Sequence, residues 1–109
     1  MALRDDEHKL DWSLLPVQPL EEAIGVLMFG AAKYSPNNWR EQPFFDRARI
    51  TNSLKRHQAA IDKGEVYDKE SGARHSAHVL VNAMFQSYYE TEIWKDNDII
   101  EFVATPEKG

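Results

Sequence analysis

The chain contains no cysteine, no excess of basic residues and no long apolar run. Without cysteine it has no disulfide scaffold, no thiol nucleophile and no cysteine-ligated zinc. Its 13 basic residues are outnumbered by 18 acidic ones, a formal net charge of −5. This argues against a protein that coats DNA, although it leaves room for one bound nucleotide. No segment approaches the roughly 18 apolar residues of a membrane span, and residues 1–7 lack the apolar core of a secretory signal. We therefore expect a cytoplasmic protein.

Apolar residues recur at helical spacing in three segments, which predicts an all-α fold. The predicted helices span about residues 19–34, 44–63 and 73–94, with a turn at 35–38, a stop at Gly64 and a polar loop at 65–72. We expect residues 10–16 to be extended and to lay Trp12 and the nearby leucines on the domain. Residues 99–104 are expected to form a short strand or a docked extension. The whole chain, 1–109, is predicted to be a single domain, with 96–109 as a tail.

The third predicted helix is unusual because the 15 residues from His75 to Tyr89 include no charged residue. A chain that is 28% charged would place about four there, so this helix is expected to be enclosed on most sides. Packing against the other two predicted helices would leave part of this helix uncovered. We therefore predict a four-helix-type bundle that is completed by oligomerisation, as a homodimer or homotetramer.

The same helix carries a polar row formed by His75, His78 and Asn82, with Gln86 one turn further on. Buried polar side chains need partners, because an unsatisfied one costs about 1–3 kcal/mol. One interpretation is an interior pocket where imidazoles and an amide bind a ligand or metal, or move protons near pH 7. The other is a hydrogen-bond network between subunits.

Carboxylates gather in two places, Glu21-Glu22 on the first predicted helix and Glu65, Asp68 and Glu70 in the acidic loop. Hard cations such as Mg²⁺ take one or two carboxylates together with substrate phosphates. The alternative for the loop is that Asp68, Glu70 or Ser71 caps the third helix. The alternative for the pair is that it lies in a first turn and complements the helix dipole.

A cationic and aromatic group is the fourth candidate, and its members are Lys33, Tyr34, Asn38, Trp39, Arg56 and His57. Lysine and arginine suit phosphate oxygens, and aromatic rings can stack on a base or sugar. Lys33 could instead complement a helix C-terminus, and Trp39 could be a core plug. The chain has no phosphate-binding glycine loop, dinucleotide fingerprint, nucleophile elbow or HExxH pair, which disfavours covalent catalysis and Rossmann cofactors.

Several short motifs occur in a fixed order along the chain. They are Leu14-Leu15-Pro16, Leu20-Glu21-Glu22, Phe29-Gly30-Ala31-Ala32-Lys33-Tyr34, Asn38-Trp39, Lys55-Arg56-His57, Gly64-Glu65, Asp68, Glu70-Ser71-Gly72, His75, His78 and Asn82. Over about residues 11–90 this series resembles the dATP/dGTP diphosphohydrolase N-terminal domain family, which is enriched in phages and is an outlying relative of the MazG-like all-α pyrophosphohydrolases. The resemblance implies a host-cytoplasmic, oligomeric helical enzyme that uses Mg²⁺ or Mn²⁺ to cleave a purine (deoxy)nucleoside triphosphate to a monophosphate and pyrophosphate.

Site roles follow from this resemblance. The expected cation ligands are Glu21, Glu22 and Glu70, followed by Glu65 and Asp68, and the expected catalytic residues are Glu22, His75 and His78. The expected nucleotide-binding residues are Lys33, Tyr34, Asn38, Trp39, Arg56, His57 and Asn82. The chain departs from MazG-like enzymes where Gly25 and Val26 replace a further carboxylate. The alternatives are a non-catalytic nucleotide-binding protein of the same fold and a purely structural oligomer.

Overall fold

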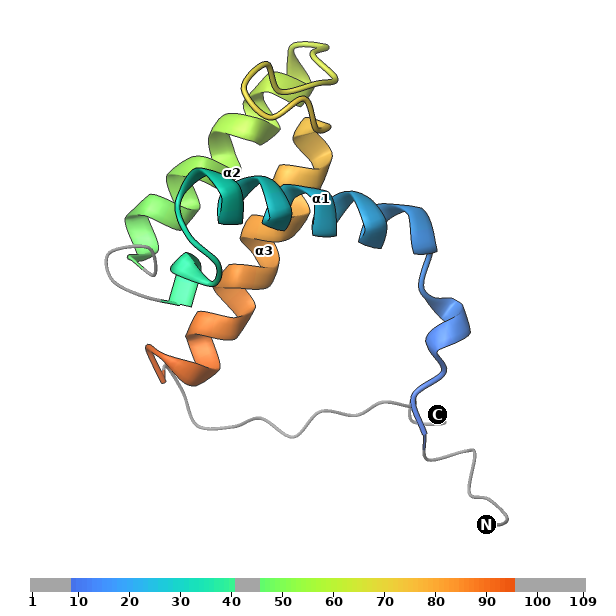
Figure 1. The fold of residues 1–109 in the computed structure, drawn as a ribbon, viewed down its shortest axis with the longest axis vertical. Coiled ribbons are helices and arrows are strands. Elements are labelled where there is room, and N and C mark those ends of the chain that lie inside the picture. Colours follow the sequence, from blue (N-terminus) through green and yellow to red (C-terminus); the bar gives the residue numbers. More distant parts are fainter. Residues whose placement is uncertain (1–8, 41–45, 96–109) are drawn as a thin grey trace, which may run out of the picture.

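The computed structural model describes residues 9–40 and 46–95, and within these ranges the regular elements are all helical. This confirms the predicted fold class. The α-helices are α1 (Val17–Lys33), α2 (Arg47–Asp62) and α3 (His75–Glu92), and two short 3₁₀ helices are η2 (Trp12–Leu14) and η3 (Asn38–Arg40). Figure 1 shows α2 and α3 side by side and antiparallel, with α1 crossing them. Among the described residues, no helix has the length and apolar character that crossing a membrane requires.

Helix α1 begins two residues before the predicted start. Pro19 is tolerated inside its first turn because the first four backbone N–H groups of a helix have no partner within it. With the start at Val17, Glu21 and Glu22 lie beyond the first turn, which contains no acidic residue. The interpretation of this pair as a complement to the N-terminal dipole is therefore wrong.

The segment before α1 also differs from the expectation. It forms a 3₁₀ turn in which the Asp11 carboxylate accepts a hydrogen bond from the Ser13 N–H at 3.1 Å, so it is not extended. Trp12 and Leu14 are 70% and 79% exposed. The prediction that these side chains pack on the domain is wrong, because the turn is held by its own hydrogen bonds and not by packing.

Helix α2 starts after Asp46, whose carboxylate accepts a hydrogen bond from the Ala48 N–H at 2.8 Å. The predicted start at Phe44 lies outside the described residues, as does the predicted strand or extension at 99–104. The helix ends at Asp62, and Gly64 has a φ of +95°, a conformation that glycine adopts without strain. The predicted stop is thus confirmed.

The loop between α2 and α3 is ordered by backbone hydrogen bonds. The Asp68 N–H donates to the Ala73 carbonyl, and the His75 N–H donates to the Val66 carbonyl, both at 2.8 Å. The cap residue of α3 is Arg74, and no side chain makes a capping hydrogen bond there. The alternative in which Asp68, Glu70 or Ser71 caps α3 is therefore wrong. The Asp68 carboxylate and the Ser71 hydroxyl accept hydrogen bonds from N–H groups of the loop, and Glu70 pairs with Lys33.

Helix α3 contacts both other helices, and it does so with two different faces. Its apolar face contributes Ala77 and Val81 to a core shared with Ala23 and Val26 of α1. Its polar row turns toward α2, where His75 and Asn82 are buried, although Gln86 is exposed. Within one chain α3 is enclosed only in part, because Ala83, Met84 and Ser87 of its charge-free stretch are exposed. Completion of the bundle by a second subunit stays a prediction.

Candidate functional site

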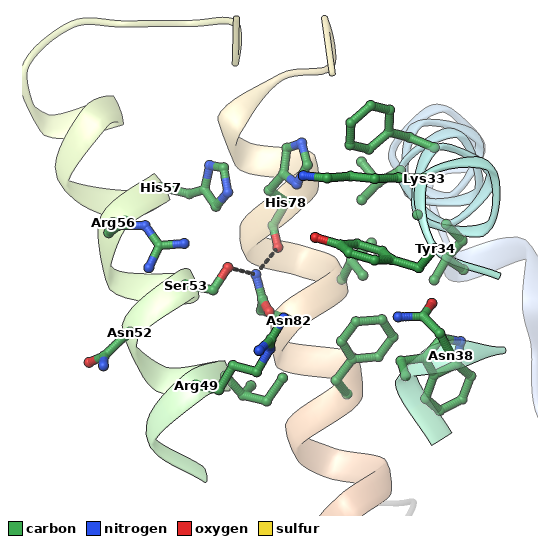
Figure 2. A pocket seen from close by; sticks show the side chains of 18 of the residues that line it. Lys33, Tyr34, Asn38, Arg49, Asn52, Ser53, Arg56, His57, His78 and Asn82 are labelled. Atoms are coloured by element: carbon green, nitrogen blue, oxygen red, sulfur yellow. Dashed lines mark hydrogen bonds between the residues drawn. The ribbon is translucent and has the colours of Figure 1, made fainter. Parts of the chain in front are cut away.

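A cavity of about 540 Å³ lies between α1, η3, α2 and α3. Figure 2 shows Lys33, Tyr34 and Asn38 on one side and the side chains of α2 on the other, with His78 and Asn82 of α3 between them. Its polar and charged lining consists of Lys33, Tyr34, Asn38, Arg49, Asn52, Ser53, Arg56, His57, Glu70, His78 and Asn82. This volume lies in the range of small-molecule sites, about 300–1,000 Å³.

The cavity is cationic although the chain is acidic. Three basic residues, Lys33, Arg49 and Arg56, line it with a single carboxylate, Glu70. Lys33 pairs with Glu70, and this hydrogen bond raises the pKa of the lysine. Arg56 makes no hydrogen bond or ion pair with any residue that the structure describes, so its guanidinium is available to an anionic ligand.

Two side-chain hydrogen bonds fix the floor of the cavity. The Asn82 amide nitrogen donates to the Ser53 hydroxyl at 3.1 Å and to the His78 carbonyl at 3.0 Å. Because both acceptors belong to the same chain, this part of the polar row is satisfied without a second subunit.

Trp39 forms part of the cavity wall and anchors η3 to α3. Its ring stacks on Phe85 with centroids 4.9 Å apart, and its carbonyl accepts a hydrogen bond from the hydroxyl of the fully buried Tyr89. The Arg40 guanidinium lies 4.5 Å from the Trp39 ring centroid. These contacts favour the core-plug interpretation of Trp39, while the residue still lines the cavity.

Three histidines meet at one end of the cavity. The Nδ1 atoms of His57 and His75 are 2.8 Å apart, and the rings of His57 and His78 stack with centroids at 4.3 Å. The Nε2 of His78 forms a hydrogen bond with the Ser71 hydroxyl at 2.7 Å. These contacts lie within one chain, so the polar row is not only a network between subunits.

Burial keeps the imidazoles of His57 and His78 neutral at pH 7. Burial, with the neighbouring His78, lowers the pKa of His57 to about 4, and burial also lowers the pKa of His78. Burial opposes ionisation of Asp68, but hydrogen bonds from Ser71 and the nearby His78 leave its pKa below the usual value. A neutral imidazole has a lone pair that can accept a proton or bind a metal ion.

All seven predicted nucleotide-binding residues come together in the cavity, whereas Glu70 is the one predicted carboxylate that lines it. Lys33, Tyr34, Asn38, Trp39, Arg56, His57 and Asn82 all line it, together with Glu70 and His78. Glu22 instead pairs with Arg74 at 3.3 Å outside the lining, and Glu21 is exposed. Glu65 and Asp68 lie beside the histidine cluster, at His75 and His78 respectively, and neither they nor His75 line the cavity.

Sequence reasoning missed Arg49, Asn52 and Ser53, which line the same cavity. The signal was present, because residues 49, 52, 53 and 56 are spaced three or four apart and share one face of a helix. These polar residues lie next to the apolar face predicted for the second helix. A polar face in that position could have indicated the wall of a cavity.

The potential metal ligands near the cavity can be compared with the ligands that the expected Mg²⁺ prefers. Among residues 9–40 and 46–95, the one group of at least three histidine or acidic side chains with clustered ligand atoms is His57, Asp68 and His75. Mg²⁺ takes oxygen ligands, whereas two of these three side chains offer nitrogen. This donor set does not fit Mg²⁺.

The fold and the cavity define a small all-α protein with a cationic binding pocket. The sequence matches the family described as "dATP/dGTP diphosphohydrolase, N-terminal" over residues 2–98, and the chain belongs to this family. A relative from Salmonella phage PMBT28, named dATP/dGTP diphosphohydrolase, is 31% identical over 84 residues. The match covers 77% of this chain and 28% of that relative, so the chain spans less than a third of its length. No solved structure matches the chain.

Proposed function

We propose that this chain binds a purine deoxynucleoside triphosphate in the cavity and hydrolyses it to the monophosphate and pyrophosphate. The observation that carries the proposal is that Lys33 and Arg56 line one cavity from α1 and α2, beside neutral histidines. The preference for a purine rests on the substrates in the name of the phage relative, dATP and dGTP. Family membership supports the same reaction class.

The placement of the nucleotide follows from the chemistry of the lining. The triphosphate would lie between Lys33 and Arg56, because their charges offset those of the phosphate oxygens. The base and sugar would lie toward Tyr34 and Asn38, since an aromatic ring can stack on a base and an amide can hydrogen bond to its edge.

Hydrolysis requires a water molecule that attacks the α-phosphorus while the bond to the bridging oxygen of the β-phosphate breaks. The pyrophosphate leaves with the electrons of that bond, and the water proton passes to a base. His78 is suited to this step because it lines the cavity and burial keeps its imidazole neutral. Lys33 and Arg56 would stabilise the charge that develops on the leaving group.

Binding of the triphosphate is tested by calorimetric titration with dATP and with deoxyadenosine. We expect Arg56→Gln to weaken dATP binding about 10- to 100-fold, since a hydrogen bond to a charged group is worth about 1.5–3 kcal/mol. Deoxyadenosine affinity should be unchanged. Lys55→Gln is the matched control, because it removes an adjacent exposed cation that does not line the cavity. Equal dATP affinity in Arg56→Gln and the control would contradict the proposed placement.

A second candidate is a protein that captures a nucleotide without cleaving it. The observation that favours it is the pairing of carboxylates, Glu70 with Lys33 and Glu22 with Arg74, because paired carboxylates are less available to a cation. Recovery of intact dATP after long incubation with divalent metal ions would support this candidate.

We further propose that the chain forms a homo-oligomer through α1. Leu20, Ile24 and Met28 follow one another at a spacing of four residues and are 37%, 55% and 66% exposed. Side chains at this spacing share one helix face, and an exposed apolar stripe of this kind is typical of a protein interface.

A further inference from the structure

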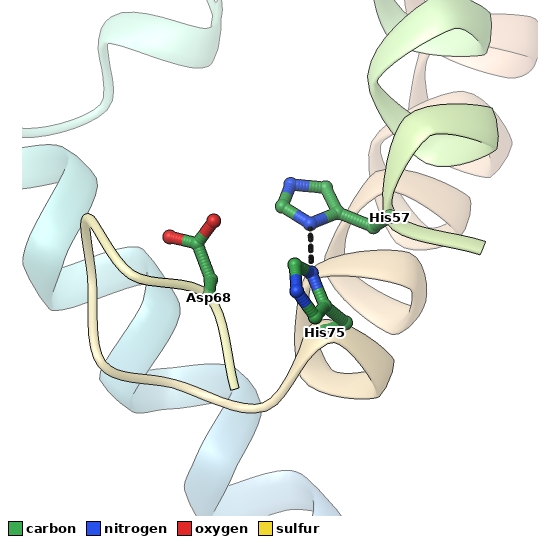
Figure 3. A group of neighbouring side chains, drawn as sticks. All are labelled: His57, Asp68 and His75. Carbon is green, nitrogen blue, oxygen red and sulfur yellow. Dashed lines mark hydrogen bonds between the residues drawn. The ribbon is translucent and has the colours of Figure 1, made fainter. Parts of the chain in front are cut away.

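Three potential metal ligands converge from three separate segments beside the cavity. His57 comes from α2, Asp68 from the loop and His75 from the first residue of α3, and each offers one ligand atom within 4.8 Å of the others. Figure 3 shows the two imidazoles facing each other and the Asp68 carboxylate beside them. The loop is held by backbone hydrogen bonds, including that from the Gly72 N–H to the Asp68 carbonyl at 2.8 Å. The loop backbone therefore fixes the positions of Asp68 and His75.

The spacing of the ligand atoms is close to what one metal ion requires. Two atoms bound at about 2.1 Å lie about 3.0 Å apart at right angles and about 3.4 Å apart in a tetrahedron. The Nδ1 atoms of His57 and His75 are 2.8 Å apart. The three ligand atoms all lie within 4.8 Å of one another, so the widest gap has to close by at most about 1.4 Å to reach tetrahedral spacing.

His75 supplies a second, independent indication. Its side chain is 8% exposed, and its buried Nε2 makes no hydrogen bond to any residue that the structure describes. The Glu65 carboxylate lies 3.4 Å from this nitrogen. When a histidine binds a metal through one nitrogen, the other carries the hydrogen and usually donates it to a carboxylate, a carbonyl or water. Binding through Nδ1 would give the Nε2 of His75 this arrangement with Glu65.

We propose that His57, Asp68 and His75 form a binding site for a divalent transition-metal ion such as Zn²⁺. Two imidazoles and one carboxylate match the ligand preference of zinc and similar ions, and Mg²⁺ prefers oxygen. Three protein ligands leave a coordination position open, and His57 also lines the cavity. The site departs from the carboxylate-bound Mg²⁺ that the family resemblance implies. It can be tested without nucleotide, so its failure would leave the proposed function standing.

The test is a titration of chelator-treated protein with Co²⁺, whose visible absorption reports its coordination. We expect stoichiometric binding that Zn²⁺ reverses and that equimolar Mg²⁺ does not. His57→Gln, His75→Gln and Asp68→Asn should each weaken Co²⁺ binding more than about 100-fold, because losing even an outer-shell partner typically costs 10- to 100-fold. Circular dichroism of each variant reports whether its helices are intact.

Two control variants define the ligand set. Asp62→Asn removes an exposed carboxylate of α2, and Glu92→Gln removes an exposed carboxylate of α3; neither residue belongs to the group. Both should keep Co²⁺ affinity within a few-fold of the original chain. The proposal is overturned if the chain binds no Co²⁺, if Mg²⁺ displaces it at equal concentration, or if a folded His57→Gln protein binds it as tightly as the controls.

Discussion

The hydrogen bond between Tyr89 and Trp39 makes a quantitative prediction for stability. The Tyr89 side chain is fully buried, and its hydroxyl donates to the Trp39 carbonyl, which joins α3 to η3 across 50 residues of sequence. Burial raises the pKa of Tyr89 to about 12, so the hydroxyl keeps its hydrogen at neutral pH. Tyr89→Phe removes the hydroxyl and keeps the ring. Because the carbonyl then loses this donor, we expect the free energy of unfolding to fall by about 1–3 kcal/mol.

The assay is urea unfolding followed by circular dichroism. We expect a lower midpoint with an unchanged m-value, since the surface exposed on unfolding stays the same. Tyr67→Phe is the control, because Tyr67 is 57% exposed, and its unfolding free energy should change by less than about 0.5 kcal/mol. A Tyr89→Phe protein as stable as this control would refute the account of how η3 is anchored.

Two further predictions concern pH and assembly. In chelator-treated protein the free energy of unfolding should fall as pH drops from 6.5 toward 4. Burial and His78 lower the pKa of His57 to about 4 in the folded chain, so the unfolded chain takes up the proton first. This pKa shift corresponds to a loss of at most about 3 kcal/mol in unfolding free energy, which solvent screening reduces to about 1–2 kcal/mol. In urea titrations at several pH values, the unfolding free energy of His57→Gln should depend less steeply on pH than that of the original chain. Sedimentation velocity should give a dimer or larger for the original chain and a smaller species for Ile24→Lys, because Ile24 is 55% exposed in the apolar stripe of α1. A stable monomer of the original chain at micromolar concentration would contradict the proposed assembly.

The helices could be predicted from sequence because their apolar spacing is local information. The start of α1 was misplaced because proline is compatible with several positions in a first turn. The packing of Trp12 was misjudged because exposure depends on whether another surface is available to cover a side chain, and sequence pattern does not report that.

Two cations of the site, Lys33 and Arg56, were predictable from sequence, whereas the positions of most carboxylates were not. Lys33 and Arg56 were identifiable because basic residues suit phosphate oxygens, and each is adjacent in sequence to a residue with a ring, Tyr34 or His57. The pairing of Glu22 with Arg74 depends on how α1 crosses α3, a tertiary feature. The contact between His57 and His75 spans 18 residues and depends on the path of the loop, so spacing along the chain could not reveal it.

The most direct test of the proposed activity is product analysis by ion-exchange chromatography. Purified protein would be incubated with each common deoxynucleoside and ribonucleoside triphosphate, in the presence of Mg²⁺, Mn²⁺ or Zn²⁺. We predict that dATP or dGTP disappears and that dAMP or dGMP and pyrophosphate appear in equal amounts. Intact triphosphates under every condition, or formation of a nucleoside diphosphate and inorganic phosphate, would contradict the proposal.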